Sequence, residues 1–359
     1  MGKLFAALYV ATMHDNNGRS NRFMLESLPQ AQYGCKFLEV SMEKNFGIVI
    51  TCYPGDAHFA QASYMSVRYF LGPDIPICFI VDGDPVCLGE VLTDKNVTTL
   101  VREDVVDSRL KETGFGWGFT KMVGLWHSPF KESLYLDADA IVWGDVVHSY
   151  YKDGYDFIVD QQKTYADAEI AFWFFAPQEI VKYYPDFDFT KFRARYACTG
   201  TFFARRRTID LQDWYDIAML QKRDPNVFLF GGEMGPLNFL WAYGCQRESV
   251  RILSVKYQVI PVDHEDNELR QYYSPEALLA NRIKPAVIHF CGKKPNIFTR
   301  SVKVASMNFF RKRYLLEKAK LSPCRALLLM AWQDIRFVFV PWLKRGVSKV
   351  KKLIGLITN

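Results

Sequence analysis

The chain has 359 residues, of which 49% are hydrophobic, enough for a sizeable core in one large domain with appendages or in two modest domains. Its formal charge at pH 7 is +6; basic residues crowd the last sixty positions, whereas acids cluster between Asp82 and Asp188. Because basic residues are less concentrated in the predicted α/β core, this distribution argues against a nucleic-acid-binding protein.

The cysteines and the N-terminus bear on the compartment. None of the eight cysteines forms a C-x-x-C pair, and several lie inside apolar runs, as Cys52 and Cys78 do. This pattern predicts reduced thiols in a cytoplasmic protein, not zinc ligands or a disulfide framework. The apolar run at residues 4–13 is too short to span a bilayer and lacks a cleavage site, so we expect no secretory signal there. Residues 1–45 are assigned as an N-terminal extension whose role the sequence does not define.

From residue 46 the pattern alternates between strands and helices. We expect strands at 47–52, 76–81, 97–101 and 133–136, with helices at 57–71 and 120–126 between them. This alternation predicts an α/β fold with a mostly parallel sheet that is covered by helices on both faces. Ligands of such sheets bind beyond the carboxyl ends of the strands. Thr51 to Tyr53, Asp82 and the pair Asp137 and Asp139 all follow strand ends, so we expect them at one edge.

Further along the chain the pattern loosens. It predicts strands at 199–204 and 286–290, a helix at 211–220, and a second helix that opens at the glycines of 231–235. The remainder, 299–359, is predicted to be a basic, amphipathic, helical C-terminal region.

The basic character of that region is concentrated in five positions that alternate with apolar residues: Lys344, Arg345, Lys349, Lys351 and Lys352. Such a stretch is suited to lie on an anionic membrane surface, which would make the protein peripheral on the inner face of a membrane. A helix packed on the protein with a solvated basic face explains the pattern equally well.

The paired acids Asp137 and Asp139 form a D-x-D motif directly after a short buried strand. Two carboxylates at a strand end repel each other, so a cation should compensate their charge. A hard divalent metal that also binds a diphosphate meets this need. The alternative is a pair of surface acids in a turn.

Four blocks, in order, resemble the motifs of one enzyme family. Phe119–Met122 with Trp126 and Leu134–Asp139 resembles F-T-K-L…W…D-A-D; Thr199, Gly200 and Phe202 resemble N-[SA]-G-V; 231–238 resembles G-G-D-Q-G-x-L-N; and 289–295 resembles H-F-x-G-x-x-K-P-W. The chain thus resembles the glycogenin-like, family 8-type branch of the retaining nucleotide-sugar glycosyltransferases. The resemblance covers residues 46–298 and implies a GT-A fold, that is, a Rossmann-like sheet flanked by helices, here with a C-terminal helical extension.

The resemblance implies a role for several residues. His289 would be the third metal ligand beside Asp137 and Asp139, for Mn²⁺ or Mg²⁺, and Lys294 would meet the diphosphate. Lys121 would reach the acids and the donor sugar. Glu233, at the position of the family's first Asp in G-G-D-Q-G, would lie near the donor sugar and the acceptor.

Each assignment has a simpler alternative. His289 could be a core histidine, Lys121 a solvated helix lysine, and Glu233 an acid favoured by a helix N-terminus.

Three further residues and one glycine are assigned to the nucleotide. Thr51 and Tyr53 are predicted to contact the base and Asp82 the ribose, although an aspartate before Gly83 is equally suited to a turn. Gly292 would let the backbone approach the diphosphate closely.

Departures from the family pattern bear on the substrate. Cys198 stands where the family has Asn, Met234 replaces Gln, and Asn296 replaces the last Trp, after a spacing one residue shorter. The sequence predicts a metal-dependent transferase that uses a nucleotide-sugar, expected to be a UDP-sugar, and a saccharide or lipid-linked glycan acceptor. Two other functions stay open: a nucleotidyltransferase, and a non-catalytic relative that binds the nucleotide-sugar without turnover.

Overall fold

The computed structural model describes residues 44–116, 118–292 and 294–337. The chain divides between residues 42 and 43, and every described residue belongs to the second part. The N-terminal extension therefore lies outside the described residues, apart from its last two positions, and so do the five basic positions between 344 and 352.

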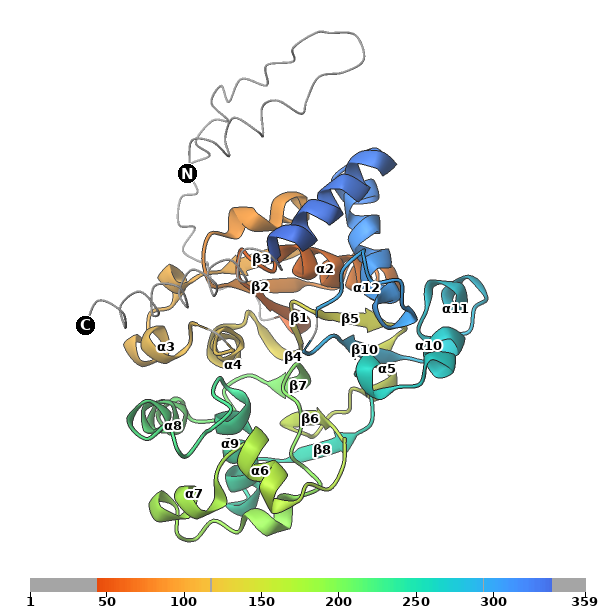
Figure 1. The fold of residues 1–359 in the computed structure, drawn as a ribbon. Helices are drawn as coiled ribbons and strands as arrows, with labels where there is room; N and C mark the ends of the chain where they lie inside the picture. Colours follow the sequence, from red (N-terminus) through yellow and green to blue (C-terminus); the bar gives the residue numbers. More distant parts are fainter. Residues whose placement is uncertain (1–43, 117, 293, 338–359) are drawn as a thin grey trace, which may run out of the picture. The chain divides into compact units, whose positions relative to one another are not determined.

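The main element is a seven-stranded sheet with the order β3-β2-β1-β4-β7-β6-β8 (Figure 1). Its strands, in chain order, are β1 (Lys44–Cys52), β2 (Ile77–Val81), β3 (Val97–Leu100), β4 (Phe130–Asp137), β6 (Phe157–Asp160), β7 (Thr201–Arg205) and β8 (Ile252–Val255). Strands β3, β2, β1 and β4 are mutually parallel, β7 is antiparallel to both of its neighbours, and β6 is parallel to β8. The predicted mostly parallel α/β sheet is confirmed.

A second, three-stranded sheet has the order β5-β10-β9, with β5 (Ala140–Trp143), β9 (Gln258–Val259) and β10 (Ala286–His289). Strand β10 runs antiparallel to β5 and places His289 opposite Ala140. Because Ala140 follows Asp139 directly, this register brings a histidine from the end of the chain to the paired acids.

Helices cover both faces of the seven-stranded sheet. The helices and short helical turns are η1 (Pro85–Thr93), η2 (Arg102–Asp104), α2 (Ala57–Leu71), α3 (Ser108–Thr113), η3 (Thr120–Val123), α4 (Gly124–His127), α5 (Val146–Tyr150), α6 (Asp167–Trp173), α7 (Pro177–Tyr183), η4 (Phe189–Phe192), α8 (Leu211–Arg223), α9 (Met234–Gln246), η5 (Pro261–Asp263), α10 (Asp266–Tyr272), α11 (Pro275–Leu279), α12 (Val302–Arg313) and the π-helical turn η6 (Tyr314–Lys318). The helix predicted at 57–71 has these same bounds, and Gly72 ends it at φ 89°.

Side-chain alternation along β1 divides the interior into two cores. Ile48 and Ile50 point into one core together with residues of α2 and α12, whereas Val49 points into the other with residues of α4, α8 and α9. Successive strand residues face opposite sides of a sheet, so a strand that is apolar at every position must be covered twice. The figure shows this division, with α2 and α12 on one side and α4, α8 and α9 on the other (Figure 1).

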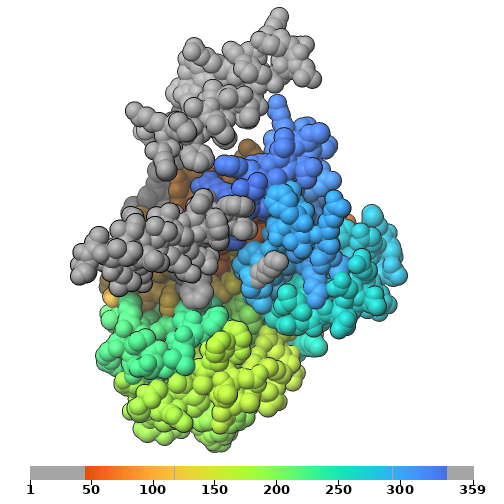
Figure 2. All heavy atoms as spheres, in the orientation of Figure 1, coloured from red at the N-terminus to blue at the C-terminus, as the bar shows by residue number. Residues whose placement is uncertain are grey.

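The described part of the C-terminal region packs against the first of these cores. Residues 323–337 are helical, and Met307, Phe310, Ala326 and Met330 are buried. In the space-filling view the blue segment that contains α12 lies beside the cyan helices α10 and α11 (Figure 2). Among the described residues no helix combines the length and the apolar character that crossing a membrane requires.

A buried ion pair fixes this region. Arg311 Nη2 lies 2.7 Å from Asp334 Oδ1, and the two side chains are 1% and 2% exposed. The other oxygen of Asp334 accepts a hydrogen bond from the backbone nitrogen of Ile297 at 2.8 Å. The helix at 323–337 is thereby tied both to α12 and to the segment that follows Lys294.

His58 gives the fold a testable pH dependence. Its Nε2 is buried and has no hydrogen-bond partner in the described part of the chain. Burial, and to a lesser extent Arg311, lowers the pKa of His58 to about 3. The unfolded chain, with a histidine pKa near 6.5, therefore takes up the proton first as the pH falls, and the free energy of unfolding decreases between these two values.

We expect His58 to account for a loss of about 2 kcal/mol in the free energy of unfolding between pH 7 and pH 5. Urea denaturation at both values, on the wild type and on His58→Phe, measures this contribution. The variant should lose less stability on acidification than the wild type does. An equal loss in both proteins would contradict the assignment.

Candidate active site

Three predicted residues lie at the carboxyl ends of adjacent strands. Asp137 is the last residue of β4, and Thr51, near the end of β1, is its partner in the parallel register. Asp82 follows β2 directly, and its backbone nitrogen donates to Cys52 O at 2.9 Å. The order β2-β1-β4 thus places the three strand ends side by side.

Asp137, Asp139 and His289 form a compact group with oxygen and nitrogen ligand atoms. Each offers one such atom, and these atoms all lie within 4.8 Å of one another. His289 Nε2 is 3.9 Å from Asp137 Oδ2 and 3.7 Å from Asp139 Oδ1. Two carboxylates and an imidazole suit a divalent cation such as Mn²⁺, so the residues fit the predicted metal.

The backbone around this group holds the ring of His289 in place. Phe290 N donates to Asp139 O at 3.0 Å, and Asp137 N donates to Gly200 O at 2.9 Å. A Cβ atom on Gly200 would lie 2.1 Å from His289 Cε1, so only glycine fits there. On the other side of the ring, Nδ1 lies 3.6 Å from the Sγ of Cys198. Nε2 is consequently the nitrogen that faces the two carboxylates.

Lys121 is buried between two carboxylates and is not a solvated helix lysine. Its Nζ lies 2.6 Å from Asp137 Oδ1 and 2.8 Å from Glu233 Oε1, and it donates to Thr199 O at 2.8 Å. Burial alone would lower the pKa of Lys121, but Asp137 and Glu233 together raise it above its ordinary value. The ammonium group therefore stays charged at neutral pH.

Glu233 is fixed from several sides. Its Oε1 also accepts from Thr199 Oγ1 at 2.7 Å, and its side chain is 7% exposed. A Cβ on Gly118 would lie only 2.3 Å from Oε2, and Gly118 has a φ of +78°, which favours glycine. Glu233 directly precedes α9, but its position is determined by Lys121 and Thr199.

Lys294 forms an ion pair with Asp139 and also donates to Phe290 O at 3.4 Å. Burial would lower the pKa of Lys294, but the Asp139 carboxylate raises it. Gly292 has a φ of +78°, and a Cβ built on it would meet no heavy atom within 4 Å. Its backbone conformation, rather than crowding, accounts for a glycine there.

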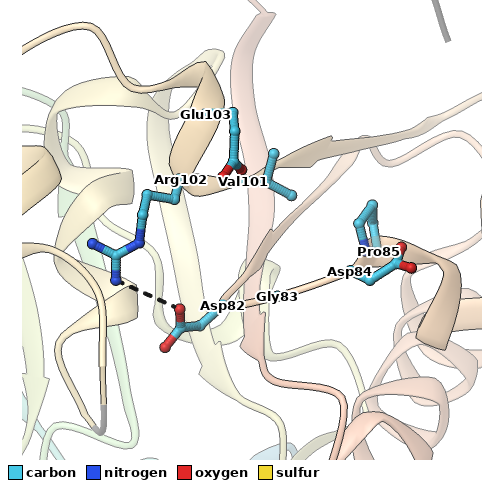
Figure 3. A pocket seen from close by; sticks show the side chains of 7 residues that line it. All are labelled: Asp82, Gly83, Asp84, Pro85, Val101, Arg102 and Glu103. Carbon is cyan, nitrogen blue, oxygen red and sulfur yellow. Dashed lines mark ion pairs between the residues drawn. The ribbon is translucent and has the colours of Figure 1, made fainter.

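Asp82 and Tyr53 are the more exposed of the residues predicted to contact the nucleotide. Asp82 Oδ2 accepts from Gly116 N at 3.0 Å, and its Oδ1 lies 3.8 Å from Arg102 (Figure 3). Arg102 in turn covers the ring of Phe115, with 4.5 Å from its guanidinium carbon to the ring centroid. Tyr53 is 47% exposed. Asp82 and Arg102 also line a pocket, together with Gly83, Asp84, Pro85, Val101 and Glu103.

The structure adds one acid, Asp56, that the sequence analysis did not assign to the site. Asp56 accepts from Tyr53 N at 2.9 Å, and its pKa is raised to about 8, first by burial and then by the charges of Asp139 and Asp137. Asp56 was indistinguishable from a turn residue.

Comparison with known proteins finds structural likeness only. No protein-family model matches the chain, and no curated protein sequence does either. Among solved structures, the bifunctional glycosyltransferase WbbM has a TM-score of 0.50 at 10% identity, over 77% of this chain and 50% of its own. This chain thus spans about half the length of WbbM.

Two other similar structures align less well. The galactosyltransferase LgtC, in complex with donor and acceptor sugar analogs, has a TM-score of 0.47 at 15% identity, over 74% of this chain and 93% of its own. The glycosyltransferase GlyE of Streptococcus pneumoniae has a TM-score of 0.44 at 14% identity, over 76% and 64%. At these identities the likeness concerns the fold, which is the GT-A fold of glycosyltransferases.

The buried position of Lys121 predicts a large effect on stability. Lys121→Met leaves the buried carboxylate of Glu233 and the partly exposed carboxylate of Asp137 without their counter-ion, and we expect it to lower the free energy of unfolding by about 3 kcal/mol. Adding Glu233→Gln should recover part of that loss, because the second change removes one of the two uncompensated charges.

A surface ion pair provides the matched control. Lys182 Nζ lies 2.6 Å from Glu179 Oε2, but the lysine side chain is 62% exposed. Lys182→Met should cost less than about 1 kcal/mol in the same urea denaturation. Equal costs for the Lys121 and Lys182 variants would contradict the buried charge arrangement.

Proposed function

We propose that the protein is a metal-dependent glycosyltransferase, of the hexosyltransferase type, that transfers a sugar from a nucleotide-sugar to a saccharide or glycan acceptor. The observation that carries the proposal is one arrangement of side chains. The possible metal ligands Asp137, Asp139 and His289 share a strand-end site with the buried pair of Lys121 and Glu233. The GT-A fold supports it, and the donor we propose is a UDP-sugar.

Asp137, Asp139 and His289 would hold a divalent ion, Mn²⁺ or Mg²⁺. When bound, the ion supplies Lewis-acid stabilisation of the diphosphate leaving group. Lys294, already paired with Asp139, would add a positive charge for the same phosphate oxygens. Thr51 and Tyr53 are the proposed contacts of the base, and Asp82 that of the ribose.

Glu233 and Lys121 would act on the sugar. Glu233 is held in one orientation by Lys121 and Thr199, so its carboxylate is preorganised. A fixed negative charge beside the anomeric carbon would stabilise positive charge that develops there, and the same carboxylate would orient an acceptor hydroxyl. Retention of configuration remains part of the proposal and comes from the family resemblance.

The environment of Cys198 bears on donor choice. Its Sγ faces Nδ1 of His289 at 3.6 Å. At this position the family's asparagine offers an amide to the sugar, whereas a thiol is only a weak donor. We therefore propose that the donor pocket relies on fewer polar contacts than in the family pattern.

Two alternative functions are a nucleotidyltransferase and a non-catalytic relative of the glycosyltransferases. A nucleotidyltransferase would share the sheet and the acids, but the turn from Tyr53 to Asp56 is not a glycine-rich basic phosphate loop. A non-catalytic relative is favoured by Cys198 and Met234 and would bind the nucleotide-sugar without turnover. A cytoplasmic location is a proposal that rests on the free cysteines, such as Cys52 and Cys78. A glycolipid acceptor and contact with an anionic membrane are proposals that rest on the C-terminal basic positions, which lie outside the described part.

Turnover without acceptor separates these functions. With Mn²⁺, we expect the wild type to release UDP slowly from one member of a UDP-sugar panel, because water substitutes for the acceptor. Asp139→Ala should reduce this rate by about 100-fold or more, since it removes a metal ligand. Asp145→Asn is the control: Asp145 caps α5 through His148 N, and asparagine also caps helices. Equal rates in wild type and Asp139→Ala would contradict the proposed metal site.

Binding can be tested apart from turnover. Calorimetric titration with UDP should give a dissociation constant that weakens at least about tenfold when Mn²⁺ is replaced by EDTA. His289→Ala should show the same weakening even with Mn²⁺ present. His264→Ala, which removes a histidine paired with Glu268, should bind as the wild type does. If the affinity for UDP changes neither with EDTA nor in His289→Ala, the proposed metal site is wrong. Metal-dependent binding of UDP without turnover of any UDP-sugar would favour the non-catalytic relative.

A further inference from the structure

Four large apolar side chains are exposed together near the end of α6. We call Phe172, Trp173, Leu229 and Phe230 the aromatic patch; their side chains are 58%, 39%, 58% and 40% exposed. The ring centroids of Phe172 and Trp173 lie 4.6 Å apart, and those of Trp173 and Phe230 lie 5.2 Å apart. Exposed apolar side chains that gather in one place, rather than singly, mark an interaction surface.

The aromatic patch adjoins Glu233 through the backbone. Phe230 is followed by Gly231 and Gly232, with φ of 75° and 64°, and then by Glu233. Gln221 Nε2 donates to Gly232 O at 3.0 Å and holds this turn. The patch therefore begins within three residues of the buried carboxylate.

The α6 side of the patch is fixed to the same place. Phe174, which follows Trp173, packs so closely on α9 that a Cβ on Gly235 would lie 2.0 Å from its carbonyl oxygen. Gly235 is the second residue after Glu233, and α6 and α9 lie together in Figure 1. Two segments distant in sequence thus bring their exposed rings together beside the backbone that leads into Glu233.

The charges around the patch disfavour an anionic occupant. Helix α6 carries Asp167 and Glu169 and no basic residue. The neighbouring cations Arg193 and Lys163 form ion pairs with Asp167 and Glu169 respectively. An anionic lipid surface requires an excess of unpaired basic residues, whereas both of these cations, in the part of the chain that the structure describes, are already paired.

We propose that the aromatic patch binds the acceptor, and that the acceptor presents a neutral pyranose ring there. Flat aromatic rings match the apolar face of a pyranose, while the hydroxyl groups at the ring edge stay hydrated or point toward Glu233. Trp173, which contacts two other rings, is the central residue of this subsite. The inference rests on the proposed function, since it takes the sugar at Glu233 to be the donor's.

Saturation-transfer NMR on the full chain, with lactose, maltose and chitobiose as probes, tests the subsite. We expect the wild type to bind at least one of the three, and Trp173→Ala to weaken that binding about tenfold. Trp173→Phe keeps a flat ring and should retain most of the affinity. Trp332, 48% exposed on the helix at 323–337, gives the control Trp332→Ala, which should bind as the wild type does.

The outcomes separate this inference from the proposed function. If none of the three disaccharides binds, or if Trp173→Ala and Phe172→Ala both bind as the wild type does, the subsite is overturned. Sedimentation with phosphatidylglycerol vesicles that depends on Trp173 would also overturn it in favour of a membrane contact. Loss of disaccharide binding in Trp173→Ala supports the subsite even where no UDP-sugar is hydrolysed, because missing hydrolysis contradicts only the proposed transferase.

Discussion

The site depends on the compensation of carboxylates that are crowded at one strand end. Asp137, Asp139 and Glu233 would repel one another, and the structure interleaves them with Lys121, Lys294 and His289. Lys121 bridges Asp137 to Glu233, and Lys294 pairs with Asp139. Removing either lysine leaves a carboxylate without its counter-ion, which costs more than the contact itself contributes. The arrangement nevertheless leaves one edge, between the two aspartates and His289, where a divalent ion suits the ligand atoms.

Topology explains how such distant residues meet. The parallel order β2-β1-β4 aligns the first three strand ends, whereas β7, reversed between β4 and β6, brings its amino end with Thr199 and Gly200 to the same edge. The small sheet adds His289 by pairing β10 with β5, immediately after the D-x-D motif. Each motif is short, and only this combination of two sheets places them within a few ångströms of one another.

Part of this was predictable from the sequence, and the reasons are physical. Apolar runs that end at Asp82 and Asp137 predict buried strands, and the spacing of 57–71 predicts a helix, because local periodicity determines which side chains are covered. The metal role of Asp137 and Asp139 was predictable from the buried strand that they follow, whereas His289 as the third ligand came from motif resemblance, because no local pattern links it to the two acids. Hydrophobic periodicity does not report contacts between segments that are distant in sequence. Three features arise from such contacts: the burial of Lys121, the raised pKa of Asp56, and the position of α6 beside the 229–232 turn.

The C-terminal helices belong to this physical argument as well. The carboxylate of Asp334 joins Arg311 of α12 and the backbone of Ile297, which lies three residues beyond Lys294. An ion pair with both side chains this deeply buried has few alternative arrangements, since any shift exposes one charge to an apolar core. The segment that carries Lys294 toward Asp139 is therefore anchored to the helix at 323–337 through Asp334. In this way the described C-terminal helices support the position of a cation at the site, whatever surface the basic positions beyond residue 337 contact.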